Sequence, residues 1–178
     1  MMGVVVALVG TVAATYIYFA QGFAPVATGA PAMPFEKRLA RLALHARIEK
    51  EMPRTVPIEA SEAHYLAGAH AYLEHCAVCH GLPGKPETAI ARGEFPKPPP
   101  LFEGKGVTDD PPGETYWKTA NGIRLTGMPG FEKSLPQTQI WELALLLANA
   151  DKLPDSVMAV LNGRPDPAAA PVSPPTGK

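Results

Sequence analysis

The hydrophobic pattern at the start of the chain is one long apolar run. Val4 to Phe23 comprises 20 mainly apolar residues, and no charged side chain precedes Glu36. As a helix the run is about 30 Å long, which matches the hydrocarbon core of a bilayer. Aromatic residues gather at its far end, as they do at membrane interfaces. The pattern predicts a single-pass membrane anchor over residues 1–23.

A signal peptide is the competing interpretation of this run. The charged region that opens a signal peptide is missing, and the apolar run is long for this class of segment. The motif Ala30-Pro31-Ala32 resembles a cleavage site, but its proline makes a poor one. The pattern therefore favours an uncleaved anchor, while flanking charges do not assign its topology.

A polar and periodic segment follows. Residues 24–60 are predicted to form a linker with a helix over 35–52, stopped by Pro53. The apolar face that this periodicity predicts consists of Leu39, Leu42, Ala43 and Ala46. The basic residues of the segment are Lys37, Arg38, Arg41, Arg47, Lys50 and Arg54. Such a helix serves as a solvated spacer, or it lies on anionic headgroups or on a partner subunit.

The pattern from residue 61 to residue 153 predicts a globular, all-α domain. Ser61 is a suitable N-cap for a helix over 62–75, and shorter helices are expected over 115–121 and 137–150. Between them, residues 81–112 contain eight prolines, which rules out long helices there. Residues 154–178 are expected to form a short helix followed by a disordered, proline-rich tail.

Charge and cysteine content narrow the possible functions. The formal net charge of −1 disfavours nucleic-acid binding, because such proteins normally carry a basic surface. From residue 61 to residue 153 there are eight Lys and Arg against eleven Asp and Glu, so the domain is not basic either. Two cysteines are too few for the disulfide framework of a small secreted domain.

The two cysteines lie in the motif Cys76-Ala-Val-Cys79-His80. A closed zinc site needs four ligands, and the chain has no second cysteine pair. A thioredoxin-like redox pair normally follows a strand, whereas this pair follows an amphipathic helix. Covalent attachment of haem remains, with two thiols for the vinyl groups and His80 as an iron ligand. Met128 is the one methionine between this motif and the last strong helix, and methionine opposite histidine is typical of electron-transfer cytochromes.

Together these residues resemble the class I cytochrome c family. Beyond the attachment motif, Gly68 and Tyr72 match the positions at which the first and last helices of the family cross, with Trp141 and Leu145 as the expected answering surface. The resemblance covers about half of the chain. It implies crossing N- and C-terminal helices around one covalent haem c, here preceded by a transmembrane helix and a linker helix.

The resemblance also implies roles around the haem. Pro99, with Pro98 and Pro100 as the next candidates, is expected to accept a hydrogen bond from Nδ1–H of His80 through its carbonyl oxygen. The stretch YWKTANGIRLTGMPGF is similar to the bacterial branch of the family, whose Trp and loop residues line the propionate side. Trp117 and Arg124 are therefore expected to contact the propionates.

The sequence thus predicts an electron carrier rather than an enzyme. Its iron is expected to be ligated by His80 and Met128, and its partners are redox proteins or subunits of a membrane-bound respiratory or photosynthetic complex. The haem domain is expected on the periplasmic side of a bacterial inner membrane. The alternative function is a haem enzyme or gas sensor, which requires that Met128 be weakly bound or displaced.

Overall fold

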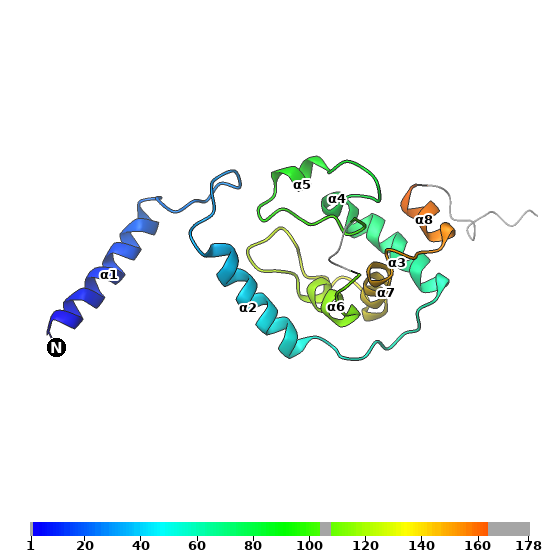
Figure 1. Cartoon of the computed structure of the whole chain (residues 1–178), viewed down its shortest axis with the longest axis horizontal. Coiled ribbons are helices and arrows are strands. Elements are labelled where there is room, and N and C mark those ends of the chain that lie inside the picture. Colours follow the sequence, from blue (N-terminus) through cyan, green and yellow to red (C-terminus); the bar gives the residue numbers. More distant parts are fainter. Residues whose placement is uncertain (1, 104–107, 164–178) are drawn as a thin grey trace, which may run out of the picture. The chain divides into compact units, whose positions relative to one another are not determined.

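The computed structural model describes residues 2–103 and 108–163, and the regular elements of this part of the chain are all helices (Figure 1). The chain divides into two compact units, Met1–Ala43 and Leu44–Lys178. The tail that the sequence predicts to be disordered, from Arg164 onward, lies outside the described residues. The predicted all-α fold class is confirmed.

The first unit contains helix α1, Met2–Ala20. By length and composition α1 is able to cross a membrane, a test that a signal sequence near the N-terminus also passes. The helix is shorter at its far end than the predicted run, because Gly22 turns the chain with φ 75°. The rings of Phe19 and Phe23 both contact Tyr18 at this end.

Helix α2, Glu36–Glu51, occupies the predicted linker, and its buried residue is Ile48. Leu39 and Leu42 are 63% and 67% exposed, while Ile48 is 2% exposed. Ile48 falls on the opposite side of the helix from Leu39 and Leu42, since each residue turns the helix by about 100°. The predicted apolar face is therefore exposed, and the helix buries its opposite side through Ile48.

The second unit is a bundle of short helices around one core. Helix α3, Glu62–His75, packs against α7, Gln137–Ala148, and α7 also packs against α6, Pro112–Asn121 (Figure 1). The short helices α4, Ala77–His80, and α5, Ala89–Gly93, lie in the segment after α3. This arrangement leaves α4, which carries the cysteine motif, at the end of the α3–α7 pair.

The start of α3 follows from its cap. Ser61 is extended, and its side-chain oxygen accepts a hydrogen bond from the backbone N–H of His64. Such a cap satisfies a donor that the helix itself leaves unpaired. The predicted start of the domain's first helix is thereby explained by local chemistry.

The α3–α7 crossing depends on Gly68. A Cβ atom at this position would lie 2.5 Å from the backbone oxygen of Glu142 and 3.2 Å from Cβ of Leu146. Only a residue without a side chain permits so close an approach of two backbones. The answering residues on α7 are therefore Glu142 and Leu146, and not Trp141 and Leu145 as predicted from the sequence.

Trp141 packs on a different neighbour. Its ring stacks on that of Tyr116 with centroids 4.2 Å apart, which joins α7 to α6. On α7, successive positions 141 and 142 point about 100° apart, so one position serves the α6 contact and the next serves the α3 crossing. The sequence predicted the helix that packs against Gly68 correctly, but it predicted the wrong face of that helix.

Substitution of Gly68 by alanine is expected to lower the free energy of unfolding by about 1–3 kcal/mol, because the added methyl group overpacks a contact between two backbones. Guanidinium denaturation of the haem-loaded protein, followed by far-UV circular dichroism, measures the effect. Gly93→Ala is the matched control, since a Cβ at Gly93 meets nothing within 4 Å. Equal midpoints for the two variants would contradict the assigned crossing.

The core extends past the domain end expected at residue 153. Helix α8, Asp155–Leu161, packs against α3 and buries Val157, Val160 and Leu161. These side chains join Tyr72 and Leu146 in the buried cluster. The short helix that the sequence placed with the tail is thus part of the globular core.

The segment before Ser61 also packs on the second unit. A Cβ at Gly113 on α6 would clash with the backbone oxygen of Pro53. Nearby, Trp117 Nε1–H donates to Glu51 Oε2 over 3.2 Å. The chain from Ile48 to Pro53 therefore lies against α6 and belongs structurally to this unit, although the sequence predicted it as a linker.

Candidate haem site

The cysteine motif forms a tight turn at the end of α3. Cys76 interrupts the helix, and α4 then runs from Ala77 to His80. The backbone N–H groups of Cys79 and His80 both donate to the oxygen of Cys76, over 3.1 and 2.9 Å. Gly81, with φ 76°, ends the turn, so that the chain leaves directly after His80. Cys76 and Cys79 are both free thiols and both half-buried.

The electrostatics of Cys76 disfavour a thiol–disulfide function. Burial, with a smaller contribution from neighbouring Cys79, raises the pKa of the Cys76 thiol to about 12. Reactive redox thiols have lowered pKa values, since the thiolate is the attacking species. A thiol held in its protonated form is instead typical of a structural position.

His80 is oriented by the proline-rich segment. Its Nδ1–H donates to the carbonyl oxygen of Pro99 over 2.9 Å. Once Nδ1 is engaged, Nε2 is the ring nitrogen left to bind a metal, and the hydrogen bond raises the basicity of the ring. The structure thus contains the contact that the sequence expected between these two residues.

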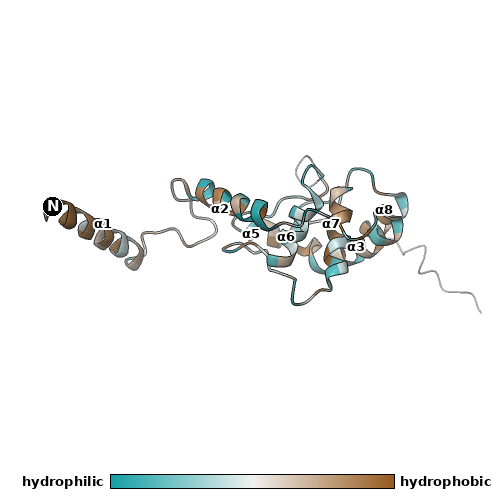
Figure 2. Cartoon of the chain, turned by 90° about the horizontal axis from the view of Figure 1, so that it is seen from below, coloured by the Kyte–Doolittle hydropathy of each residue, from teal (hydrophilic) through white to brown (hydrophobic). Residues whose placement is uncertain are grey.

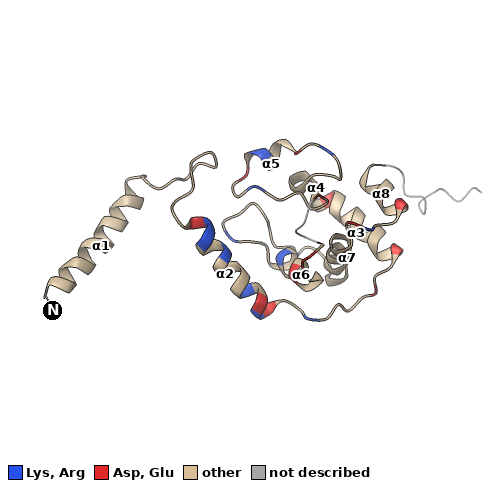
Figure 3. Ribbon diagram, in the orientation of Figure 1, with Lys and Arg blue, Asp and Glu red and all other residues tan. Residues whose placement is uncertain are grey.

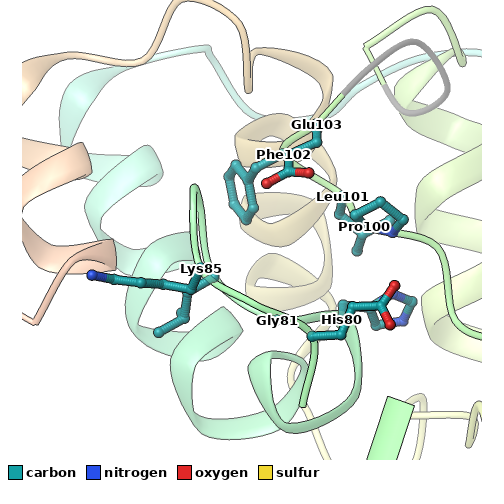
Figure 4. Close-up of a pocket in the computed structure, with 9 residues that line it drawn as sticks. His80, Gly81, Lys85, Pro100, Leu101, Phe102 and Glu103 are labelled. Atoms are coloured by element: carbon teal, nitrogen blue, oxygen red, sulfur yellow. The ribbon is translucent and has the colours of Figure 1, made fainter. Parts of the chain in front are cut away.

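The surroundings of His80 include a small pocket (Figure 4). It is lined by residues of two segments, His80–Glu87 and Pro100–Glu103. Figure 4 shows Pro100, Leu101 and Phe102 from the second segment facing the turn after the histidine. The proline-rich chain therefore lies alongside the attachment motif and brings the Pro99 carbonyl to the imidazole.

Two side chains brace the turn from outside. Tyr72 O–H donates to the backbone oxygen of Gly81 over 2.7 Å, and its ring meets that of Phe102 edge to face. Burial raises the pKa of Tyr72 well above its usual value, so the hydroxyl remains a donor. Thr88, the N-cap of α5, donates to the oxygen of Val78 over 2.7 Å. These bonds fix the backbone on both sides of Cys79 and His80.

Met128 lies on a loop that closes on itself. The Met128 N–H donates to Thr126 Oγ1 over 3.1 Å, and its carbonyl oxygen accepts from the N–H of Ile123 over 3.2 Å. Thr126 in turn donates to the oxygen of Ile123 over 2.6 Å. A loop bonded in this way holds the half-buried methionine on a defined backbone.

Gly122 sets the position of this loop against α6. It has φ 68°, and a Cβ there would lie 2.5 Å from the nitrogen of Gly130 and 2.8 Å from the oxygen of Met128. Both the left-handed conformation and the close approach require glycine. The end of α6 and the methionine loop are therefore in backbone contact.

Glu94 connects the methionine loop to the attachment motif, and sequence reasoning missed it. Cys79 Sγ donates to Glu94 Oε1 over 3.4 Å, and a Cβ at Gly127 would lie 2.7 Å from the same oxygen. The carboxylate thus lies between the second cysteine and the residue before Met128. One signal was available in the sequence, because Glu94 is an acidic residue in a segment rich in glycine and proline.

The two residues expected at the propionates are placed differently from each other. Trp117, on α6, uses its indole N–H to bond Glu51, and the indole has no second donor. Arg124 lies exposed on the methionine loop, four residues before Met128. The Trp117 N–H is therefore engaged by Glu51, whereas Arg124 is exposed to solvent.

The donor set fits a covalent haem better than a bare metal ion. Within residues 2–103 and 108–163, no group of three or more His, Cys, Asp and Glu side chains is placed to hold a metal ion. Two thiols, an imidazole with its Nδ1 already bonded, and a thioether on a closed loop are the groups that attachment and axial ligation require. Cys76, Cys79, His80 and Met128 are therefore suited to hold haem c.

A comparison with models of known families finds a match. The sequence model of the family described as cytochrome c oxidase, cbb3-type, subunit III matches residues 63–147. Among solved structures, a chain of the Kuenenia stuttgartiensis reducing HAO-like protein complex is 28% identical, with a TM-score of 0.46. The similarity covers 57% of this chain and 52% of that one, so about half of the relative's length is represented. A comparison with curated proteins finds no match.

Proposed function

We propose that this chain, in which residues 63–147 form a class I c-type cytochrome domain with one covalently bound haem c, is a mono-haem electron carrier. His80 and Met128 are the proposed iron ligands. When bound, the haem supplies an iron that exchanges one electron between its ferric and ferrous states. The haem chemistry of the family supports electron transfer in general. We propose the two iron ligands and the physiological role of the domain.

Each site residue has a distinct part in this proposal. Cys76 and Cys79 would hold the ring through thioethers, and His80 would bind the iron through Nε2. Pro99 keeps the imidazole oriented by accepting its Nδ1 proton, a second-shell contact that also strengthens the ligand. Met128 would be the second iron ligand, and the hydrogen bonds within its loop would hold it in place.

The single observation that carries the electron-transfer assignment is the closed loop around Met128. A carrier needs both axial positions filled in both oxidation states, whereas a haem enzyme or gas sensor needs one position to open. The bonds from Met128 to Thr126 and Ile123, together with the backbone contact at Gly122, favour a ligand that stays in place. They support the carrier over the enzyme or sensor.

Absorption spectra of the purified protein test this function. A pyridine haemochrome spectrum is expected to report one haem c with two thioethers for each chain. The oxidised protein is expected to show the near-infrared charge-transfer band of a thioether–iron bond. A haem-loaded protein that lacks this band and binds carbon monoxide rapidly in its reduced form would support the enzyme or sensor instead.

A membrane location is the second part of the proposal. Helix α1 has the length and composition of a span, and haem c is attached on the periplasmic side of bacterial membranes. We infer a single-pass anchor in the bacterial inner membrane, with the cytochrome domain on the periplasmic side. The matched family is named for a subunit of an oxidase, which supports redox partners in a respiratory or photosynthetic complex.

We expect Arg124→Gln to lower the reduction potential by about 20–40 mV. A cation beside the propionates stabilises the reduced site, which carries one negative charge more, and a partly solvated charge contributes on the order of 0.5–1 kcal/mol. Spectroelectrochemical titration measures the shift, with Lys152→Gln as a control that removes a cation at the far end of α7. If the two variants have equal reduction potentials, Arg124 does not lie beside the propionates.

A further inference from the structure

Helix α2 carries apolar side chains on two opposite faces. At about 100° per residue, Leu44 and Ile48 lie on one face. The other face is the apolar stripe formed by Leu39, Leu42, Ala43 and Ala46. Ile48 is 2% exposed and belongs to the second unit, whereas Leu39 and Leu42 are 63% and 67% exposed. The stripe therefore presents two leucines to solvent, although the helix has already used its other face for packing.

The helix is cationic around this stripe. Arg38 precedes Leu42 by four residues and Lys50 follows Ala46 by four, so a basic side chain lies near each end of the stripe. From residue 36 to residue 43 there are three cations and one anion, and the carboxylate of Glu36 accepts a hydrogen bond from the Met33 N–H over 2.8 Å. In Figure 3 blue segments mark Lys and Arg along α2 and red segments mark the acidic residues at its two ends, and Figure 2 shows apolar and polar positions alternating along the helix.

The stripe begins a short distance along the chain from the candidate span. Fifteen residues separate Ala20, the end of α1, from Glu36, the start of α2. A flexible segment of this length spans about 20–23 Å root-mean-square. If α1 crosses a bilayer, the first turns of α2 remain within reach of the lipid headgroups.

We propose that the stripe lies in the headgroup layer of an anionic phospholipid bilayer, with Leu39 and Leu42 inserted and Arg38, which flanks Leu42, at the phosphates. A helix with an apolar face and basic flanks binds such an interface through both burial and charge. This inference rests on the membrane anchor proposed above. It adds a second membrane contact, on the helix whose Ile48 and Glu51 pack on the cytochrome domain.

Spin labels on the full-length, haem-loaded protein in vesicles test the proposal. Leu42→Cys places a nitroxide on the stripe, and Ala40→Cys places the control on the far side of the same turn, where the residue is also exposed. Only the new thiol reacts if Cys76 and Cys79 are held as thioethers. The vesicles contain phosphatidylcholine alone or phosphatidylcholine with phosphatidylglycerol.

In anionic vesicles the label at position 42 is expected to collide several-fold more often with oxygen, relative to a water-soluble nickel complex, than the label at position 40. Adding Arg38→Gln should reduce this difference in anionic vesicles and leave the haem spectrum unchanged. Equal, water-like accessibility at both positions overturns the proposal. So does a label at position 42 that is immobilised in either lipid without gaining oxygen contact, since that result indicates a protein partner.

The test separates this inference from the proposals on which it depends. A protein that is washed from the vesicles by alkaline carbonate contradicts the α1 anchor and, with it, the headgroup contact. A protein that stays with the vesicles but has water-exposed labels contradicts the headgroup contact alone. Neither result bears on the haem ligands, which the absorption spectra test.

Discussion

Replacing Cys76 and Cys79 together with serine is expected to abolish covalent haem and to leave the cytochrome domain largely unfolded. The bundle has short helices, and its buried cluster is small for a domain of this size. Iron ligation and packing around the haem would form only in the folded chain, and they would therefore add to its stability. Without the thioethers, most of this contribution is lost.

The double variant is measured by haem content after acid–acetone extraction and by far-UV circular dichroism. Ser134→Ala is a suitable control, because Ser134 is exposed and its hydroxyl bonds only the neighbouring Phe131 oxygen. The control is expected to keep both its haem and its helicity. A double variant without haem but with native-like helicity would show that the bundle is stable by itself and would contradict the proposed role of the cofactor.

Met128→Ala is expected to keep the covalent haem but to open the sixth coordination position. The reduced variant should then bind carbon monoxide readily, and the reduction potential should fall, because a thioether ligand favours the ferrous state. The charge-transfer band of the oxidised protein should also disappear. Stopped-flow mixing with carbon monoxide and potentiometry measure these changes.

Met158→Ala is the matched control for this experiment. Met158 lies on α8, packs against the buried cluster and is outside the methionine loop. Its truncation is expected to cost about 2–5 kcal/mol at most in stability, with the potential and the ligand binding unchanged. If wild type already binds carbon monoxide rapidly and Met128→Ala changes nothing, the electron-carrier assignment is wrong.

Much of the local structure was predictable from the sequence because it depends on neighbours along the chain. Ser61 caps the helix that follows it and Gly81 ends the turn after His80, whereas α6 begins at Pro112, three residues before its predicted start. The attachment motif is likewise local, since its chemistry requires two thiols and an imidazole at a fixed spacing. Met128 was found by exclusion among six methionines, which also needs no three-dimensional information.

Which surfaces meet was decided by the tertiary structure. Gly68 signals a close crossing, but only the packed helices show that Glu142 and Leu146 answer it, while the adjacent Trp141 turns to Tyr116. In the same way, periodicity finds an apolar stripe at Leu39 and Leu42 without showing that α2 buries the opposite side through Ile48.

The underlying reason is that sequence patterns specify the faces of an element, whereas contacts depend on pairs of elements far apart in the chain. Glu94 illustrates this most directly. Fifteen residues separate it from Cys79 and 33 from Gly127, yet its carboxylate lies between them. The sequence by itself determined the helices, the attachment motif and the candidate ligands. Only the packing of the chain determined that Glu94 lies between the attachment motif and the methionine loop, because these contacts join residues far apart in the sequence.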